Sequence, residues 1–444
     1  MFESIPGLWP WAELCQALAL KPAAGPTVQR VVCDSRQIQP GDLFIALPGD
    51  PGPRFNPAYR SMVDGHDFVA AAAEQGAVGA MVHRSVPGAE ELALLETSDT
   101  YDGLWQLGRA AAARHAGHRV AITGSSGKTT AKTMLAAATA GYASPGSYNN
   151  HIGVPLSLLN LPPQAQIAAL EVGTNHPGEI EPLAAMIKPE VAVLLNVHSA
   201  HLENFSDWPA LKEEKLSIFN ALENKNNAVW EESLALSTGF CFGYSHDANA
   251  RLLEIEGDLA RFDLFGQILQ ARIPGGGEHR ALTLAATLLV LKILELDLAA
   301  ALALPESLVP AGRGRVHRFG SSVLVDESYN ANPESMRATL LAFAQRPEAR
   351  KVAVIGEMLE LAERSEAAHL EMADVLAGMQ VFCVGEGTKP LAERLGSPWF
   401  EVADDVLLGR IDEFLEAPGA ILVKGSNRVF WQHQFVERVL QKHT

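Results

Sequence analysis

One segment restricts the fold of this chain more than any other. The run Thr123-Gly-Ser-Ser-Gly-Lys-Thr-Thr130 directly follows an apolar stretch at 120–122. A buried strand that enters a glycine-containing turn and then a helix directs backbone N–H groups toward one point, where they bind phosphate oxygens. Lys128 adds a cation, and the Thr129 hydroxyl is a ligand suited to Mg²⁺. The strict Walker pattern has a glycine where Ile122 stands, so a strand-to-helix turn that merely contains GKTT is the alternative. The segment predicts a nucleoside triphosphate site formed by Gly124, Ser125, Ser126, Gly127, Lys128, Thr129 and Thr130.

Length and charge narrow the class of protein. The 444 residues are enough for about three domains, and the 48% hydrophobic and 20% charged composition is that of a folded globular protein. With 35 Lys and Arg against 52 Asp and Glu, the net charge of -17 disfavours nucleic acid and anionic membranes as partners. The four cysteines are far apart and form no CxxC pair, so neither a zinc site nor a disulfide framework is expected. We find no export signal, and charged residues interrupt the most apolar stretch, 281–304, so a cytoplasmic protein without a membrane span is expected.

Alternating strand and helix patterns predict an α/β protein with three domains, at 1–95, 96–309 and 310–444. The first is a small α/β unit with a proline-rich loop at 48–61, which we interpret as an insertion. The second contains strands at 120–123, 168–172 and 191–197 and is expected to form a parallel sheet with crossover helices. The third contains four strand and helix alternations, typical of a doubly wound, Rossmann-like domain.

Polar residues follow the predicted strands of the second domain. Glu171 ends the strand near 168–172, which places a carboxylate beside the phosphate site, where Mg²⁺ needs an oxygen ligand. His198 and His201 follow the next strand at the same edge and are candidate metal ligands, although a loop histidine is usually only a polar surface residue. Asn149 and Asn150 supply amide groups that can orient a carboxylate or an acyl phosphate.

Six strings in this order resemble those of one family, the Mur ligases: TGSSGKTT, NNHIGVP, EVGTN, NVHSAHLE, GRGR and DESYNANP. These are ATP-dependent amide-forming enzymes of peptidoglycan precursor synthesis, and the resemblance spans nearly the whole chain. The strings YNNHIGVPLSLL, DESYNANPESM and GEMLEL are most similar to the branch that adds D-alanyl-D-alanine to UDP-N-acetylmuramoyl tripeptide. The resemblance thus implies an ADP-forming peptide ligase with these two small-molecule substrates, ATP and two Mg²⁺ ions. We expect a monomer.

The resemblance also assigns residue roles. Lys128, His201, Lys215 and Arg313 would be catalytic, and His279, Arg313 and Asp326 would join the phosphate loop in binding ATP. Ser35, Arg36 and His66 would lie on the uridine diphosphate side, and Asn149, Asn150 and Lys424 would contact substrate. Metal would be bound by Thr129, Glu171, His201 and Lys215. Lys215 would be carbamylated, because a bare ammonium beside Mg²⁺ is repelled whereas a carbamate supplies an anionic oxygen; a solvated helix lysine is the alternative.

The chain departs from the family pattern at several positions. Arg280 and Thr283 stand where two asparagines usually occur at the adenine site, Ser217 replaces a glutamate, and Asn427 precedes Arg428 in a string that resembles LVKGSR. Competing hypotheses are a divergent ligase, for example of the folate polyglutamate type, which would lack the DSR and DGHDF strings, and a P-loop regulatory protein without ligase turnover. A dehydrogenase is disfavoured because GEMLEL is not a GxGxxG fingerprint.

Overall fold

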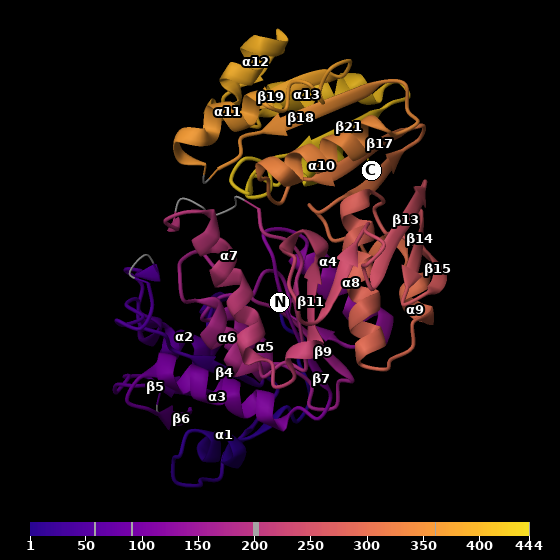
Figure 1. The fold of residues 1–444 in the computed structure, drawn as a ribbon. Helices are drawn as coiled ribbons and strands as arrows, with labels where there is room; N and C mark the ends of the chain where they lie inside the picture. The colour runs from indigo at the N-terminus through magenta and orange to yellow at the C-terminus, as the bar shows by residue number, and fades with distance from the viewer. Residues whose placement is uncertain (57–58, 90–91, 199–203, 360, 444) are drawn as a thin grey trace.

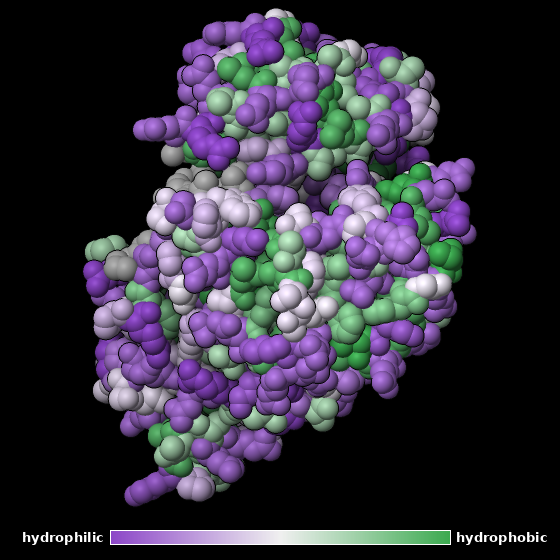
Figure 2. Space-filling model, in the orientation of Figure 1, coloured by the Kyte–Doolittle hydropathy of each residue, from purple (hydrophilic) through white to green (hydrophobic). Residues whose placement is uncertain are grey.

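The computed structural model describes residues 1–56, 59–89, 92–198, 204–359 and 361–443. Three sheets, within residues 30–96, 118–272 and 315–424, each have helices packed on them, which confirms the expected α/β class (Figure 1). The C-terminal sheet and its helices form a separate lobe at the top of the view, joined to the rest of the molecule at a narrowed waist (Figure 2). Hydrophilic and hydrophobic residues are interspersed over the face shown there.

The first sheet is parallel and has the strand order β3-β4-β5-β6. Its strands are β3 (Arg30–Val32), β4 (Asp42–Ile45), β5 (Gly79–Val82) and β6 (Ala93–Glu96), with helix α2 (Val69–Glu74) before β5. A short antiparallel pair, β1 (Trp9–Pro10) and β2 (Thr27–Val28), flanks α1 (Trp11–Ala17). Because β6 ends at Glu96, the expected boundary at residue 95 falls inside this strand and stays a prediction.

The central sheet has the order β15-β14-β13-β12-β11-β10-β7-β9-β8. Its strands are β7 (His118–Thr123), β8 (Tyr142–Ala143), β9 (Ile167–Glu171), β10 (Val191–Leu194), β11 (Ala228–Glu231), β12 (Phe240–Gly243), β13 (Ala250–Glu256), β14 (Leu259–Leu264) and β15 (Gln267–Arg272). Neighbours pair in parallel as far as β13, but β13, β14 and β15 are antiparallel. The expected parallel sheet is present, and the antiparallel strands at this end extend it. There β14 and β15 alternate buried and exposed residues because only one face is covered.

Helices cover both faces of the central sheet. They are α3 (Thr100–Arg114), α4 (Lys128–Thr139), α5 (Gly153–Leu159), α6 (Ile180–Ile187), α7 (Trp208–Leu216), α8 (Glu278–Ile293) and α9 (Ala299–Leu302). The apolar stretch that begins at Ala281 forms most of α8, which is buried against α4 and strands β12 and β13. Within the described residues, none of the helices combines the length and the apolar character that a bilayer crossing requires.

The C-terminal sheet has the order β16-β17-β21-β18-β19-β20, and only β16 is antiparallel to its neighbour. Its strands are β16 (Arg315–Phe319), β17 (Ser322–Glu327), β18 (Lys351–Gly356), β19 (Gln380–Val384), β20 (Trp399–Phe400) and β21 (Ala420–Lys424). The helices are α10 (Pro333–Ala344), α11 (Ser365–Leu370), α12 (Lys389–Leu395), α13 (Asp405–Leu415) and α14 (Phe435–His443). The four predicted strands are present, while β16 and β20 were not predicted because each is short or largely exposed.

Candidate active site

The phosphate loop lies where β7 ends, between its neighbours β9 and β10. Asn196, just after β10, braces it: the Ser125 N–H donates to the Asn196 carbonyl (3.2 Å) and the Ser126 N–H to its side-chain oxygen (2.9 Å). Gly127 has φ +83°, a conformation that favours glycine, and α4 begins at Lys128. The Ala131 N–H donates to the Gly127 carbonyl, whereas the N–H groups of residues 127–130 have no hydrogen-bond partner among the described residues. These free donors at a helix N-terminus form a cradle suited to phosphate.

Glu171 is the buried acid of the site. Its carboxylate accepts a hydrogen bond from the Thr129 hydroxyl (2.5 Å) and lies 2.8 Å from the Lys132 ammonium, with the Asn149 amide at 3.5 Å. Burial favours the protonated form, but Lys132, Thr129 and Lys128 lower the pKa of Glu171 overall. The residue is 1% exposed, so it is not a solvated glutamate at a strand end. The Thr129 hydroxyl and an ionised carboxylate side by side are the oxygen donors that Mg²⁺ prefers, so these residues fit that ion.

Burial depresses the pKa of Lys128, Lys132 and Lys215. Burial lowers the pKa of Lys128, whose ammonium donates to the Gly124 carbonyl at the start of the loop. Burial, followed by repulsion from Lys128, lowers the pKa of Lys215 to about 7. The Lys215 side chain is 2% exposed, and no hydrogen bond or ion pair joins its ammonium to another described residue. The alternative of a solvated helix lysine is therefore wrong for Lys215.

The structure describes only one of the two histidines that are predicted as metal ligands. His201 lies outside the described residues. His198 lies beside the phosphate loop, because its backbone N–H donates to the Ser125 hydroxyl (2.9 Å), and burial lowers its pKa. No group of three His, Cys, Asp or Glu side chains within the described ranges is arranged to hold a metal ion.

Arg313 reaches the central domain from the segment that precedes β16. Its guanidinium lies 4.1 Å from the centre of the Tyr329 ring and donates to the Ser147 hydroxyl (3.2 Å), which also contacts the Tyr329 hydroxyl (3.0 Å). The positive charge of Arg313 contributes to lowering the pKa of Lys128. The structure thus brings Lys128, Glu171 and Arg313 into one electrostatic group.

Several residues that are predicted to bind nucleotide or substrate form hydrogen bonds or ion pairs with other residues of the chain. Asp326 accepts hydrogen bonds from Gly312 N–H and from both the N–H and the hydroxyl of Ser328. The Lys424 ammonium donates to the Asn330 carbonyl (3.2 Å) and lies 3.7 Å from Glu327. The Asn150 side-chain oxygen accepts hydrogen bonds from the N–H groups of Ile152 and Gly153 where α5 begins. Contacts of these residues with nucleotide or substrate stay predictions.

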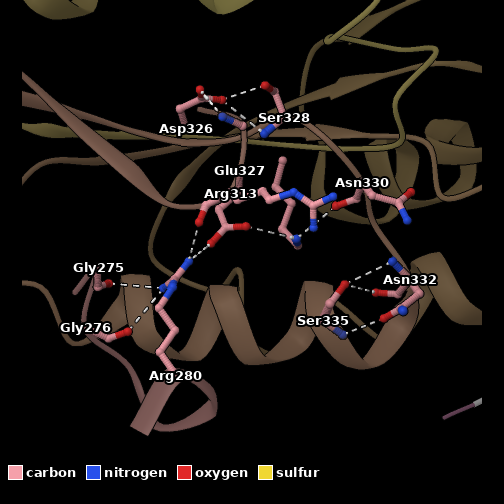
Figure 3. A network of polar contacts seen from close by, with 12 residues as sticks. Gly275, Gly276, Arg280, Arg313, Asp326, Glu327, Ser328, Asn330, Asn332 and Ser335 are labelled. Atoms are coloured by element: carbon pink, nitrogen blue, oxygen red, sulfur yellow. Dashed lines mark hydrogen bonds and ion pairs between the residues drawn. The ribbon is translucent and has the colours of Figure 1, made fainter. Parts of the chain in front are cut away.

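His279 and Arg280 open α8 close to the C-terminal lobe. Burial lowers the pKa of His279 to about 3, so the imidazole is neutral. The Arg280 guanidinium forms an ion pair with Glu327 rather than remaining free (Figure 3). Burial opposes ionisation of Glu327, yet Arg280 and Lys424 lower its pKa to about 2.

The three residues predicted for uridine diphosphate lie in short 3₁₀ turns of the first unit. Ser35 and Arg36 form a short 3₁₀ turn capped by Asp34, which also pairs with the exposed Arg36 guanidinium (2.8 Å). His66 is 1% exposed, with one ring nitrogen 2.7 Å from Asp64 and the other accepting from the His83 N–H. No hydrogen bond or ion pair of the described residues joins these three to the phosphate loop.

A cavity lies between the phosphate loop and the C-terminal lobe. Ser125 lines it from the loop side, and Arg428, which has no hydrogen bond or ion pair with a described residue, lines it from the lobe. The remaining lining residues are Asn330, Ala331, Asn332, Leu359, Leu361, Ser426, Asn427 and Gln432.

The family models for the Mur ligase middle domain and for the Mur ligase, glutamate ligase domain match residues 122–281 and 313–427. The chain is 30% identical over 449 residues to an Escherichia coli UDP-N-acetylmuramoyl-tripeptide--D-alanyl-D-alanine ligase, with 94% of each chain covered. The chain belongs to the Mur ligase family. A Rickettsia prowazekii ligase of the same name is 29% identical to this Mur ligase over 95% of this chain and 98% of the relative.

Solved structures agree with this placement. A MurF crystal structure from Acinetobacter baumannii covers 99% of both chains with a TM-score of 0.82 at 25% identity. A Thermotoga maritima MurF ligase in complex with ADP matches this Mur ligase with a TM-score of 0.76 at 28% identity, over 94% of this chain and 98% of that one. The three-domain α/β architecture expected from the sequence is therefore confirmed.

Sequence reasoning missed three polar residues of this Mur ligase site: Lys132, Asn196 and Glu327. Lys132 was detectable, because it follows Lys128 by four residues and therefore lies on the same face of α4. Asn196 and Glu327 act through partners more than 40 residues away in the chain, so no local pattern marks them.

Proposed function

We propose that this chain is an ATP-dependent, ADP-forming ligase that adds D-alanyl-D-alanine to UDP-N-acetylmuramoyl tripeptide in peptidoglycan precursor synthesis. The observation that carries the proposal is the convergence of Lys128, Glu171 and Arg313 from two units on one phosphate-binding edge. The relatives with nearly full coverage bear the name of this activity. Because ATP is a substrate and the described cysteines are free thiols, we place the reaction in the cytoplasm.

The chemistry follows from charge. The terminal carboxylate of the tripeptide attacks the γ-phosphorus of ATP, so a carboxylate O–P bond forms and the bond to ADP breaks. Lys128 and Arg313 offset the negative charge on the transferring phosphoryl oxygens. The dipeptide amine then attacks the acyl carbon, phosphate leaves and the amine loses a proton. When bound, Mg²⁺ neutralises phosphate charge, and Thr129 and Glu171 are the residues that would hold it.

Each of the three units is assigned one substrate. We assign uridine diphosphate to residues 1–95, with Ser35, Arg36 and His66 on that side, ATP to 96–309 and the incoming dipeptide to 310–444. The cavity beside the phosphate loop suits a small zwitterionic dipeptide, because amide groups line it and Arg428 offers an unpaired charge for a carboxylate. Enclosure between the lobes would also protect the acyl phosphate from water.

The direct test is phosphate release with ATP, Mg²⁺ and UDP-muramoyl tripeptide, with and without D-Ala-D-Ala. We expect release to require both the tripeptide and the dipeptide. Lys128→Ala should lower the rate by at least ~100-fold, because it removes a cation that stabilises the transferring phosphoryl group. Lys292→Ala, on the exposed side of α8, is the matched control and should keep the wild-type rate. Faster turnover with L-Ala-L-Ala would contradict the dipeptide assignment, and release without any amine would contradict ligation.

We further propose that Lys215 is carbamylated and, together with His201, holds a second Mg²⁺. Carbon dioxide reacts with a neutral amine, and a pKa of about 7 leaves much of this ammonium deprotonated at neutral pH. We expect Lys215→Ala to be inactive and formate or acetate to restore part of the rate by supplying the lost oxygen. A carbamate signal in ¹³C NMR after labelled bicarbonate should be present in the wild type and absent in this variant. A fully active Lys215→Arg variant would refute the role, since arginine forms no carbamate under these conditions.

A further inference from the structure

Arg280 is a buried arginine of the central unit whose side chain crosses to the C-terminal lobe. Its side chain is 8% exposed. One terminal nitrogen donates to the carbonyls of Gly275 (3.1 Å) and Gly276 (3.2 Å), just before α8. The other donates to the Arg313 carbonyl (3.0 Å) and to the Glu327 carboxylate (Figure 3). The guanidinium therefore ties the start of α8 to the backbone of Arg313.

The turn that carries Arg313 is held from its opposite side by Asp326. The Gly312 N–H donates to the Asp326 carboxylate (2.6 Å), and the Gly314 N–H donates to the Asp326 carbonyl (2.6 Å). Gly314 has φ +100°, and a Cβ at this position would lie 1.9 Å from the Arg280 terminal nitrogen. Only glycine fits this turn where Arg280 packs against it. Hydrogen bonds from two sides therefore hold the backbone of Arg313 in place.

The side chain of Arg313 points back into the central unit. It contacts Ser147 and stacks on Tyr329, and its positive charge helps to lower the pKa of Lys128 in the phosphate loop. A small shift of the turn would move this guanidinium away from the phosphate site. Misplacing a reacting group by about 1 Å can cost ~100-fold in rate.

We propose that Arg280 is a positioning residue for phosphoryl transfer: paired with Glu327, it holds the Arg313 backbone so that the Arg313 side chain meets the γ-phosphate. The inference rests on the proposed function, because it assigns Arg313 to the transferring phosphoryl group. Arg280 therefore affects phosphoryl transfer by positioning Arg313 and not by contacting ATP directly.

The test compares Arg280→Gln in two backgrounds, wild type and Arg313→Gln, by steady-state phosphate release. In the wild-type background we expect kcat to fall 10- to 100-fold with the KM for ATP changed less than threefold. In the Arg313→Gln background the same substitution should change kcat less than twofold, because the group that it positions is already gone. Arg272→Gln, which removes an exposed ion pair with Asp258, is the matched control and should leave kcat unchanged.

Each alternative has its own outcome. An equal fall of kcat in both backgrounds would overturn the inference in favour of a general structural role. A KM for ATP raised more than tenfold at unchanged kcat would overturn it in favour of direct nucleotide binding. If Arg280→Gln does not fold, Arg280→Lys replaces it: lysine keeps the charge beside Glu327 but lacks the fork that reaches four acceptors, so the same background-dependent loss is expected. A wild type that releases no phosphate would contradict the proposed function itself, whereas equal losses in an active enzyme contradict only the role of Arg280.

Discussion

At the scale of single residues, burial determines which ionisable side chains carry a charge. Lys215 is enclosed, and its pKa falls to about 7, mainly because burial disfavours the ammonium. Between pH 7 and about 10 the folded state holds a neutral amine while the unfolded chain still binds a proton, so stability rises with pH in this window. We predict that Lys215→Met stabilises the protein at pH 6.5 by more than it does at pH 9.5.

The difference between the two pH values should be on the order of 2 kcal/mol or more, since each unit of pKa shift corresponds to about 1.4 kcal/mol. Urea unfolding of metal-free protein in buffer without carbon dioxide measures it. Lys292→Met, at an exposed position of α8, should show no such pH dependence. An equal effect of Lys215→Met at both pH values would mean that the ammonium is solvated.

At the scale of elements, one helix caps another beside the site. The Glu214 carboxylate of α7 accepts hydrogen bonds from the N–H groups of Gly178 (2.6 Å), Glu179 (3.0 Å) and Ile180 (2.8 Å) at the start of α6. The N-cap residue of α6 makes no side-chain cap of its own. Since Lys215 follows Glu214 directly, this cap also fixes where α7 carries the Lys215 side chain.

We predict that Glu214→Ala lowers the free energy of unfolding by roughly 1–3 kcal/mol, because three N–H groups at the start of α6, of which that of Ile180 is buried, lose their acceptor. Hydrogen exchange should accelerate in 178–183, and thermal unfolding should shift to lower temperature. The neighbouring Glu213 is exposed on the same helix, and Glu213→Ala should change neither measurement. Unchanged exchange at α6 in Glu214→Ala would show that the cap contributes nothing.

At the scale of the whole molecule, the site exists only where separate units meet. Arg313 and Arg280 cross the junction in opposite directions, and the cavity beside Ser125 is otherwise lined by the C-terminal lobe. Arg428 faces this cavity without a partner among the described side chains. The dipeptide proposed to bind there carries a carboxylate that needs a cation.

We predict that Arg428→Gln raises the KM for D-Ala-D-Ala at least tenfold, since a charge-assisted hydrogen bond of about 1.5–3 kcal/mol is lost. The KM for ATP should change less than twofold. Arg410→Gln, an exposed arginine of the same lobe on α13, is the matched control. An unchanged KM for the dipeptide in Arg428→Gln would place the carboxylate elsewhere.

The sequence by itself determined the local features of this protein. A glycine-containing turn between an apolar strand and a helix predicts the phosphate loop because the backbone geometry is local. Strand and helix alternation predicts the α/β class for the same reason, and Glu171 follows from its place at a strand end. The antiparallel strands β14 and β15 escaped prediction because a short amphipathic strand has a weak signal until its neighbour covers one face.

The tertiary structure alone decided which residues far apart in the chain contact one another. Asp326 and Glu327 are adjacent on β17, yet alternation along the strand turns one toward the Gly312 turn and the other toward Arg280 and Lys424. Burial of His66 and the low pKa of Lys215 likewise depend on what packs around them. Such partners come from other elements, and side-chain charge and hydrogen bonding in a buried site depend on all of them at once, so no stretch of sequence specifies the result.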